Sequence, residues 1–334
     1  MVRRLCYMCA LAVVILTGLM LWHETGTVRK INYTQKSKSP KSKALIQARK
    51  SIFGSSIAKV YDHVNTFVVF IGYPRSGHTL VSSLIDAHPH AIIANEFDII
   101  GNWLAWNDEQ RNKYFLFDQL YKNSRTEAKT GLRSSVKHMF NYSVKGQFQG
   151  KFKGSLKVIG AKKGGKLTKQ LTKQKQADVM DQIMKTVGVE FKFLHVVRNP
   201  FDNIATMLLR SKKLRYAVKK NQSKKLNDTS ALEREIVRYF DLVARNQILI
   251  RKYKHNLHEI QSTDLISKPR ETLRRVCSFL NLTCSKKYLD DCAKIVYKRP
   301  SRTRYSVVWT DTQIRRTLST LKRFAFLKNF TFTS

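Results

Sequence analysis

Short apolar runs alternate with amphipathic patterns along most of the chain. Runs rich in β-branched and aromatic residues predict four strands. Two of these runs lead directly into segments where apolar residues recur at helical spacing, as at Leu80, Leu84 and Ile85 after the first run. Alternating strands and helices are typical of an α/β fold with a mainly parallel sheet flanked by helices. The expected strands are 67–71, 91–94, 156–161 and 191–197, and longer helices are expected at 230–253, 269–280 and 311–326.

One apolar run near the N-terminus stands apart from this pattern. Residues 5–22 follow Arg3 and Arg4, contain no charge, and are near the length that spans a bilayer. They predict a transmembrane signal anchor behind a cytoplasmic tail of residues 1–4. A cleaved signal peptide is the alternative, although the run is long for one and no clear cleavage site follows it. The residues after the run are more basic than the tail, and the positive-inside rule therefore favours the opposite orientation.

The segment after the anchor changes in composition. Residues 23–64 are rich in Lys and Ser and show little apolar periodicity, which predicts an extended stem. Residues 65–334 are then expected to form a single folded domain. Within this domain the segment 145–175 is dense in lysine, and its charges are expected to stay outside the core. A solvated loop and an anion-binding rim explain the lysine-rich segment equally well.

The net charge of the chain is strongly positive. Lys and Arg total 62 against 23 Asp and Glu, which gives a formal net charge of +39. Such a field attracts anionic partners, whether nucleic acid, acidic polysaccharide, acidic peptide or anionic membrane. The chain contains no zinc-ligand spacing, no aromatic pattern of an RNA-recognition motif and no basic zipper, so we expect no nucleic-acid partner.

Two further features favour a body that lies in the lumen of the secretory pathway. Six Asn-x-Ser/Thr sequons follow the predicted anchor. Three cysteines, Cys277, Cys284 and Cys292, cluster near the C-terminus, where an oxidising lumen allows one disulfide and leaves one thiol. The spacing alone does not decide which two of them pair. The sequons are at Asn32, Asn141, Asn221, Asn227, Asn281 and Asn329.

The unusual polar residues all follow predicted strands. The loop 72–79 follows the first strand, Glu96 the second, Lys162 and Lys163 the third, and Arg198 the fourth. In a parallel sheet the carboxyl ends of the strands share one edge, and ligands bind in the crevice outside it. We therefore expect one loop of backbone donors, one carboxylate and several cations to converge on a single site.

The loop 72–79 is suited to holding a phosphate. Gly77 permits close backbone approach, and N–H groups at the start of the following helix point at an anion that the helix dipole favours. A nucleotide kinase or NTPase is the alternative, but His78 stands where a P-loop has its lysine, and Arg75 supplies a cation earlier in the loop. No predicted strand ends in an Asp that would hold a metal, so no metal is expected.

A second anion site is predicted in the sequence VVRNPFDNIAT. Asn199 and Pro200 fit the N-cap and first position of a helix, so Arg198 stands at a helix entrance and Thr206 lies two turns further on. A simple ion pair between Arg198 and Asp202 is the alternative.

The loop PRSGHTL, the segment LIDAHP, Glu96 and VVRNPFDNIAT together resemble the sulfotransferases that use 3′-phosphoadenosine 5′-phosphosulfate (PAPS). The spacing is most similar to that of the Golgi tyrosylprotein and carbohydrate branches, and the resemblance covers about residues 67–326. It implies that 65–334 is a sulfotransferase catalytic domain of P-loop-like α/β fold, with PAPS as donor, 3′-phosphoadenosine 5′-phosphate (PAP) as product, and no required metal. It also implies a single-pass type II protein of the Golgi membrane whose catalytic domain is lumenal.

The resemblance also assigns roles to residues. Glu96 matches the family's catalytic base, and Lys162 matches a lysine that helps the leaving group, with Lys163 as the neighbouring candidate. Arg198 and Thr206 match the 3′-phosphate site. His78 departs from the usual threonine, so only its backbone N–H is expected to contribute securely. The segment 299–309 is a further candidate for contact with the nucleotide. The 5′-phosphosulfate is expected to contact Arg75, Ser76, Gly77, His78, Thr79 and Leu80, with Arg75 also stabilising the leaving phosphate.

The acceptor is the least determined part of the prediction. The charge favours an anionic glycan or an acidic protein, and the lysine-rich segment slightly favours a hydroxyl group of a secretory-pathway glycan. The tyrosine of an acidic protein is the alternative acceptor. A membrane-tethered protein that binds anionic glycans without catalysis also explains the charge, but it leaves the convergence of the four strand ends unexplained.

Overall fold

The structure is a computed structural model, and it describes residues 55–130, 141–214 and 225–334. The predicted tail, the anchor and most of the stem lie outside these residues. Among the described residues, no helix has the length and apolar character needed to cross a bilayer. The last part of the expected stem forms helix α3 (Ser55–Asp62), whose Tyr61 is buried against Phe117 with ring centroids 5.6 Å apart.

Five parallel strands form one sheet in the order β2-β3-β1-β4-β5. The four predicted strands are confirmed with small shifts in their ends, and the α/β class with them. The sequence pattern missed the fifth strand, because its residues Leu-His-Glu-Ile-Gln lie at the edge of the sheet and only Ile260 is fully buried. The strands are β1 (Thr66–Gly72), β2 (Ala91–Asn95), β3 (Val158–Lys162), β4 (Glu190–Val197) and β5 (Leu257–Gln261).

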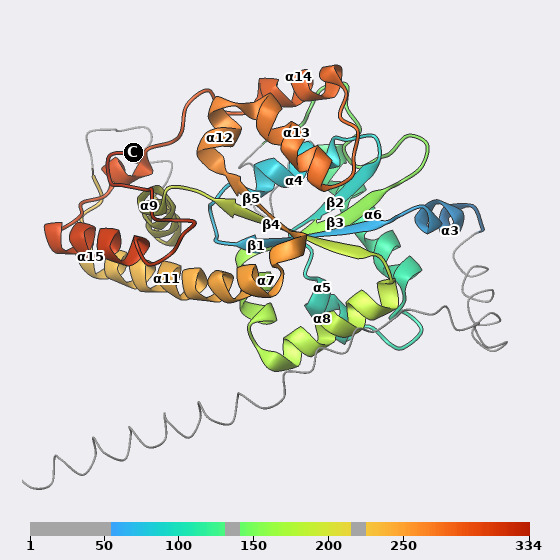
Figure 1. Cartoon of the computed structure of the whole chain (residues 1–334), viewed down its shortest axis with the longest axis horizontal. Helices are drawn as coiled ribbons and strands as arrows, with labels where there is room; N and C mark the ends of the chain where they lie inside the picture. The colour runs from blue at the N-terminus through green and yellow to red at the C-terminus, as the bar shows by residue number, and fades with distance from the viewer. Residues whose placement is uncertain (1–54, 131–140, 215–224) are drawn as a thin grey trace, which may run out of the picture. The chain divides into compact units, whose positions relative to one another are not determined.

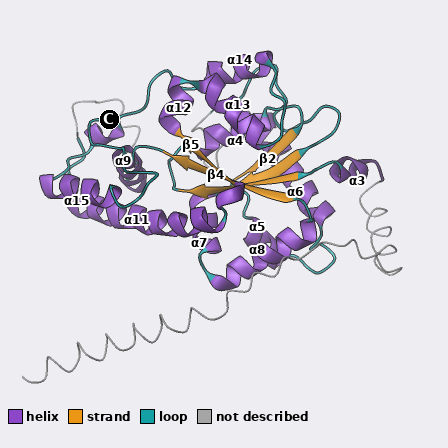
Figure 2. Cartoon of the chain, viewed as in Figure 1, coloured by secondary structure: helices purple, strands orange, loops and turns teal. Residues whose placement is uncertain are grey.

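Helices cover both faces of the sheet (Figures 1 and 2). Three predicted helices are confirmed as α11 (Thr229–Lys252), α13 (Pro269–Phe279) and α15 (Asp311–Leu321), although α15 ends five residues before the expected boundary because the chain turns there and still buries Leu327. The other helices are α4 (His78–Asp86), α5 (Ile99–Ala105), α6 (Lys113–Thr130), α7 (Gly164–Leu171), α8 (Gln174–Val187), α9 (Pro200–Ser211), α12 (Ser262–Ser267) and α14 (Lys286–Ile295), with short 3₁₀ helices η1 (Lys254–Asn256) and η2 (Thr303–Ser306).

The central strand β1 divides its side chains between two cores, because successive residues of a strand point to opposite faces. Val68 and Phe70 pack with residues of α4, α13 and α14 on one face. Phe67, Val69 and Ile71 pack with residues of α6, α7 and α8 on the other. A third cluster joins α9, α11 and α15 beside the carboxyl end of β4. Burial on both faces explains why β1 and β4 appear in the sequence as nearly continuous apolar runs.

The lysine-rich segment 145–175 is not one solvated loop. It contains β3, α7 and the first residues of α8. The expectation that its charges stay outside the core was wrong for Lys162, whose side chain is only 3% exposed. Lys162 is buried because the carboxylate of Glu96 lies beside it and compensates its charge.

The structure resolves the pairing of the cysteines. Cys277 at the end of α13 forms a disulfide with Cys284, and Cys292 on α14 is a buried free thiol. Burial raises the pKa of Cys292 to about 12, which keeps the thiol protonated and unreactive at neutral pH.

Candidate active site

A cavity of about 1120 Å³ lies at the carboxyl ends of the strands. Its lining includes the loop after β1, Glu96 after β2, Lys162 and Lys163 at the end of β3, and Arg198 after β4. The convergence expected from the sequence is therefore present in the fold. Every predicted site residue lines this cavity: Arg75, Ser76, Gly77, His78, Thr79, Leu80, Glu96, Lys162, Arg198 and Thr206.

The loop after β1 turns sharply into helix α4. Gly77 is the N-cap of α4 with φ 108°, a conformation that favours glycine. The N–H of Leu80 already donates to the carbonyl of Gly77 at 3.0 Å, so it is the N–H groups before Leu80 that the helix N-terminus offers to a ligand, and the positive end of the helix dipole lies at the same place. The start of α4 therefore offers a preformed anion site that faces the cavity.

Two predicted catalytic residues have left-handed backbone conformations. Arg75 has φ 72° and Glu96 has φ 55°, and among the described residues only Lys213 and Asn281 are other non-glycine residues with positive φ. Such a conformation costs on the order of 1–3 kcal/mol, and it tends to persist where function requires it. The strain at both positions supports their assignment to the site.

The side chain of His78 is turned beneath the loop. It is 6% exposed, and its Nε2 donates to the carbonyl of Ile71 at 3.1 Å, while Ser76 Oγ lies 3.2 Å from the same nitrogen. A Cβ on Gly72 would approach Nε2 to 2.8 Å, and a Cβ on Gly164 would approach Cε1 to 2.6 Å. Two glycines thus leave room for the imidazole, which supports the loop from below.

Burial and the positive charge of Lys162 lower the pKa of His78 to about 3. The imidazole is therefore neutral at the pH of any cellular compartment, and it does not supply the positive charge of the lysine that stands there in a P-loop. The sequence left the role of the His78 side chain open, and the structure shows a packing role.

Glu96 and two lysines form an ion cluster in the cavity. Lys162 Nζ contacts Glu96 Oε1 and donates to Thr79 Oγ1 at 3.1 Å. Lys163 Nζ donates to the backbone carbonyl of Glu96 at 2.8 Å and lies 3.3 Å from Oε2. Lys162 thus joins the anion loop to the carboxylate, whereas Lys163 contacts the carboxylate from the other side.

The cluster changes the proton affinities of its members. Burial raises the pKa of Glu96, but Lys162 and Lys163 together lower it by more. The pKa of Glu96 therefore lies below its ordinary value. Burial lowers the pKa of Lys162, an effect that the Glu96 carboxylate partly offsets. Glu96 is therefore ionised at neutral and mildly acidic pH and is ready to accept a proton.

Arg198 and Thr206 form a second polar group across the cavity. Asn199 caps α9 by accepting from the N–H of Phe201, and Arg198 precedes this cap. Arg198 Nη1 donates to Thr206 Oγ1 at 3.1 Å, and Nη2 donates to Thr303 Oγ1 at 3.0 Å. The spacing of eight residues, two turns of α9, brings the guanidinium and the hydroxyl together as the sequence predicted.

The alternative prediction was that Arg198 pairs with Asp202. In the structure Asp202 forms an ion pair with Arg304. Asp202 Oδ1 lies 3.2 Å from Nε of the buried Arg304 and accepts from its backbone N–H at 3.0 Å. This pair fixes η2 against α9. Arg198 is thereby placed beside Thr303, in the segment 299–309 that was a candidate for contact with the nucleotide.

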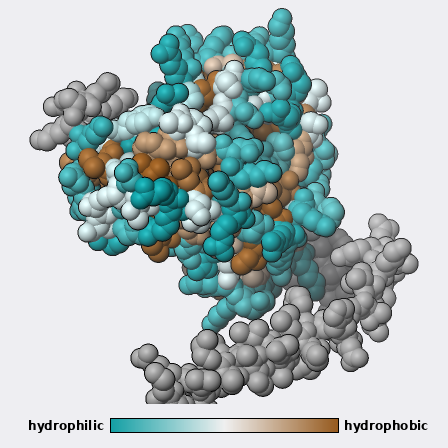
Figure 3. All heavy atoms as spheres, turned by 60° about the vertical axis from the view of Figure 1, so that its left-hand side comes forward, coloured by the Kyte–Doolittle hydropathy of each residue, from teal (hydrophilic) through white to brown (hydrophobic). Residues whose placement is uncertain are grey.

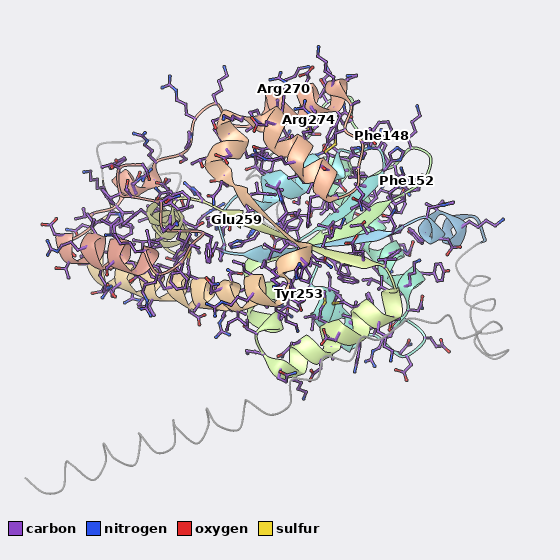
Figure 4. All side chains as sticks on the ribbon, viewed as in Figure 1. Phe148, Phe152, Tyr253, Glu259, Arg270 and Arg274 are labelled. Atoms are coloured by element: carbon purple, nitrogen blue, oxygen red, sulfur yellow. A yellow bond between two sulfur atoms is a disulfide. The ribbon has the colours of Figure 1, made fainter. Side chains whose placement is uncertain are left out.

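A buried polar network behind the loop was not foreseen. The N–H of Gly72 donates to Thr168 Oγ1 at 2.9 Å, and Thr168 Oγ1 donates to Asn246 Oδ1 at 2.9 Å. His195 lies 3.3 Å from both Tyr73 Oη and Glu259 Oε2, and Glu259 on β5 is labelled in Figure 4. These contacts join residues far apart in sequence, so no local pattern predicts them. They hold the start of the loop against α7 and α11.

The segment LIDAHP has a structural role. Both oxygens of the buried Asp86 accept hydrogen bonds, from the N–H of Ile93 at 2.6 Å and from the N–H of Gly150 at 3.0 Å. His88 Nε2 donates to the carbonyl of Thr283 at 3.1 Å. Asp86 and His88 thus fix the turn from α4 into β2, which positions Glu96, and neither lines the cavity.

The described residues contain no group of three or more His, Cys, Asp or Glu side chains arranged to hold a metal ion. The cavity instead presents cations and helix N-termini at two separated places. Such a donor set fits a ligand with two anionic groups, and a nucleotide phosphorylated at both its 3′ and 5′ positions has this character.

Comparisons with known proteins give one match to a family. The model of the sulfotransferase family matches residues 68–286, more than half of the chain. A search of curated proteins gave no match.

Several solved structures are similar to the fold at low sequence identity. The sulfotransferase domain of the olefin synthase from Synechococcus PCC 7002 is 12% identical, with 69% of this chain and 78% of that chain covered and a TM-score of 0.39. Sulfotransferase STF9 from Mycobacterium avium is 11% identical, with 87% and 88% covered and a TM-score of 0.43. Mouse sulfotransferase SULT7A1, solved in complex with PAP, is 12% identical, with 81% and 90% covered and a TM-score of 0.43.

Proposed function

The chain belongs to the sulfotransferase family, and from this we propose that it transfers a sulfonate from PAPS to a hydroxyl group of a glycan in the secretory pathway. One observation carries the proposal: an anion loop, a strained and ionised carboxylate, a buried lysine and a separate arginine site line the same cavity. The family membership establishes the enzyme class and the donor. The acceptor and the compartment are the proposed parts.

The two anion sites suit the two ends of the donor. The start of α4 and Arg75 would hold the 5′-phosphosulfate, and Arg198 with Thr206 would hold the 3′-phosphate. Apolar side chains in the cavity lining offer a surface for the adenine, because a flat base packs well on aliphatic and aromatic groups. These side chains are Leu80, Leu265, Ile266 and Tyr297.

The chemistry requires positioning and charge stabilisation. PAPS supplies an activated sulfonate, whose bond to the 5′-phosphate breaks as a bond from the acceptor oxygen to sulfur forms. Glu96 takes the proton of the acceptor hydroxyl at a carboxylate oxygen. Lys162, in contact with Thr79 of the loop, and Arg75 stabilise the negative charge that grows on the departing phosphate. The strained backbone at Arg75 and Glu96 keeps both groups directed into the cavity.

A lumenal location is part of the proposal. The disulfide between Cys277 and Cys284 fits an oxidising compartment. The four sequon asparagines within the described residues, Asn141, Asn227, Asn281 and Asn329, are all exposed and therefore accessible to glycosylation. With residues 5–22 as a signal anchor, the protein would be a type II protein of the Golgi membrane that faces the lumen.

Transfer of labelled sulfonate from PAPS tests the proposal. The full chain, expressed in membranes and extracted in detergent, is offered desulfated glycans and acidic tyrosine peptides side by side. We expect label on the glycans. Label on the peptides alone would show that the acceptor is a tyrosine and not a glycan. If the protein neither binds PAPS nor transfers sulfonate, a non-catalytic glycan-binding protein would be favoured.

Replacing Arg198 by Ala tests the assignment of the 3′-phosphate site. The variant loses charge-assisted hydrogen bonds worth about 1.5–3 kcal/mol, so its affinity for PAP should fall about 10- to 100-fold. Binding of adenosine 5′-monophosphate, which lacks the 3′-phosphate, should change little. Titration calorimetry measures both, and Arg251→Ala on the exposed side of α11 is the control for loss of one surface charge. An equal loss for both nucleotides would place Arg198 elsewhere in the donor site.

A further inference from the structure

The cavity has more positive charge than the donor requires. Beyond Arg75, Lys162 and Arg198, its lining includes Lys163, which precedes α7, Lys166 and Lys169 on α7, and Arg238 on α11. The acidic residues in the lining are Glu96 and Asp202, and both have cationic partners. The side formed by α7 and α11 is therefore a cationic part of the lining without an assigned ligand, although two of its side chains have acidic neighbours outside the lining: Lys166 pairs with Asp98, and Arg238 Nη1 lies 3.5 Å from Glu235 Oε2.

This surface lies next to the proposed base. Lys166 Nζ is 2.5 Å from Asp98 Oδ2, and Asp98 follows Glu96 by two residues. Lys169 lies one turn further along α7 and has no ion-pair partner among the residues that the structure describes. Helix α11 packs beside α7 through the bond between Thr168 and Asn246, and Arg238 precedes Asn246 by about two turns. We call Lys166, Lys169 and Arg238 the basic mouth.

The basic mouth is exposed. All three of its side chains are exposed to solvent. On the face drawn in Figure 3, hydrophilic residues predominate and hydrophobic residues form patches among them. A ligand at the mouth would thus be recognised by charge and hydrogen bonding rather than by burial of an apolar group.

The side chains that contact Glu96 are those of two lysines, Lys162 and Lys163. The cavity lining at 162–166 reads Lys-Lys-Gly-Gly-Lys and offers neither an aromatic nor an aliphatic wall for a tyrosine ring. Hydroxyl and acid groups of a sugar, in contrast, find ammonium donors there.

We propose that the basic mouth is a subsite for an acid group of the acceptor, a carboxylate or sulfate that lies close to the hydroxyl to be modified. The acceptor is accordingly an acidic polysaccharide, and a neutral glycan is a poor substrate. This inference rests on the proposed sulfonate transfer and names the acceptor class of the same site. In this arrangement Glu96 contacts the hydroxyl, and the basic mouth binds the neighbouring acid.

Charge-removing variants of the full chain test the subsite. Lys169→Gln and Arg238→Gln are assayed singly and together on a desulfated, uronate-containing glycan and on the same glycan after reduction of its carboxyl groups. An exposed ion pair is worth up to about 1 kcal/mol, so the KM for the acidic glycan should rise about 3- to 5-fold for each variant and about 10-fold for both. The kcat, the affinity for PAP and the KM for the reduced glycan should stay within about 2-fold, because no contact of these two side chains to the donor site is proposed.

Matched controls separate this effect from loss of charge in general. Lys175→Gln on α8 removes an exposed lysine that does not line the cavity. Arg274→Gln removes an exposed arginine of α13, which covers the other face of the sheet (Figure 4). Both controls should leave the KM for the acidic glycan unchanged, and the salt dependence of that KM should weaken only in the basic-mouth variants.

Three outcomes would overturn the inference. If the variants raise the KM for acidic and reduced glycans equally, or if the controls match them, the basic mouth is not a subsite, although the transfer reaction stands. If the wild-type protein prefers acidic tyrosine peptides, the acceptor class is wrong while the transfer reaction again stands. If the wild-type protein neither binds PAPS nor transfers sulfonate, the proposed function fails, and this inference with it.

Discussion

Replacing Glu96 by Gln is expected to abolish most turnover while sparing the donor site. A positioned general base contributes roughly 10²- to 10⁴-fold to a rate, and kcat should fall by this factor because an amide cannot accept the proton of the acceptor. Affinity for PAP should change little, since the phosphate sites at the start of α4 and at Arg198 are untouched. Single-turnover transfer of labelled sulfonate and calorimetric titration with PAP measure the two quantities. A variant with unchanged kcat would remove Glu96 from the role of base.

The same variant has a consequence for stability. Lys162 is almost fully buried, and in the variant its ammonium group loses the carboxylate that compensates its charge. Removing one partner of a buried ion pair is destabilising because the other charge remains desolvated. The melting temperature of Glu96→Gln should therefore fall, and PAP should raise the melting temperatures of the variant and the wild type by similar amounts, because its affinity for the two is expected to be similar. Comparison of melting curves with and without PAP separates this effect from the loss of the base.

The pH dependence follows from the direction of the Glu96 pKa. Burial raises this pKa and the two lysines lower it more, so the folded value lies below the ordinary value of 4.5. A carboxyl group whose pKa is lower in the folded than in the unfolded protein stabilises the fold at pH values above its unfolded pKa, and this stabilisation is lost as the pH falls through its folded pKa. The same low pKa keeps Glu96 ionised, and so able to act as a base, at mildly acidic pH. Protonation of Glu96 should therefore not reduce kcat/KM between pH 7 and pH 5, and the acid limb due to Glu96 should lie below pH 4.5. A pH profile of kcat/KM measures the position of this limb.

The sequence was informative about the fold where burial imposes a strong pattern. Strands β1 and β4 are buried on both faces, so their apolar runs predict them directly. The edge strand β5 has one fully buried residue and showed no such signal. Helix α7 lies in the lysine-rich segment and α8 begins at its end, and the many lysines of the two helices concealed a narrow apolar stripe, which includes Leu167, Leu171 and Met180. The sequence pattern of a helix with many charges on its solvent side thus resembled that of a solvated loop.

The site was predictable where a strand end or a helical spacing fixes the position of a side chain. Glu96 and Lys162 follow neighbouring strands, and Arg198 and Thr206 lie two turns apart on α9, so topology alone brings each pair together. Thr303, in contrast, reaches Arg198 across more than 100 residues of chain. The burial of His78 depends on the absence of side chains at Gly72 and Gly164, which only the folded loop reveals.

The choice between Lys162 and Lys163 as the residue that assists the leaving group is open in the sequence, and the geometry favours Lys162. Its Nζ contacts both Thr79 in the anion loop and Glu96, whereas Nζ of Lys163 reaches only the carbonyl and carboxylate of Glu96 in the described contacts. A group that stabilises the departing phosphate must stand on the loop side. Lys162 is thus placed between the two ends of the reaction, the proton acceptor and the leaving group.

Replacing Lys162 by Met should therefore lower kcat by about 10²- to 10³-fold, the usual effect of removing one preorganised donor from a developing charge. Methionine has a similar length and carries no charge, so the buried position is filled without an unpaired ion. The matched variant Lys163→Met removes a partly exposed contact worth about 1 kcal/mol and should cost only about 5-fold. Single-turnover rates at saturating donor compare the two. Equal losses of rate in the two variants would mean that both lysines act only through Glu96. A larger loss of rate in Lys163→Met would assign the leaving-group role to Lys163.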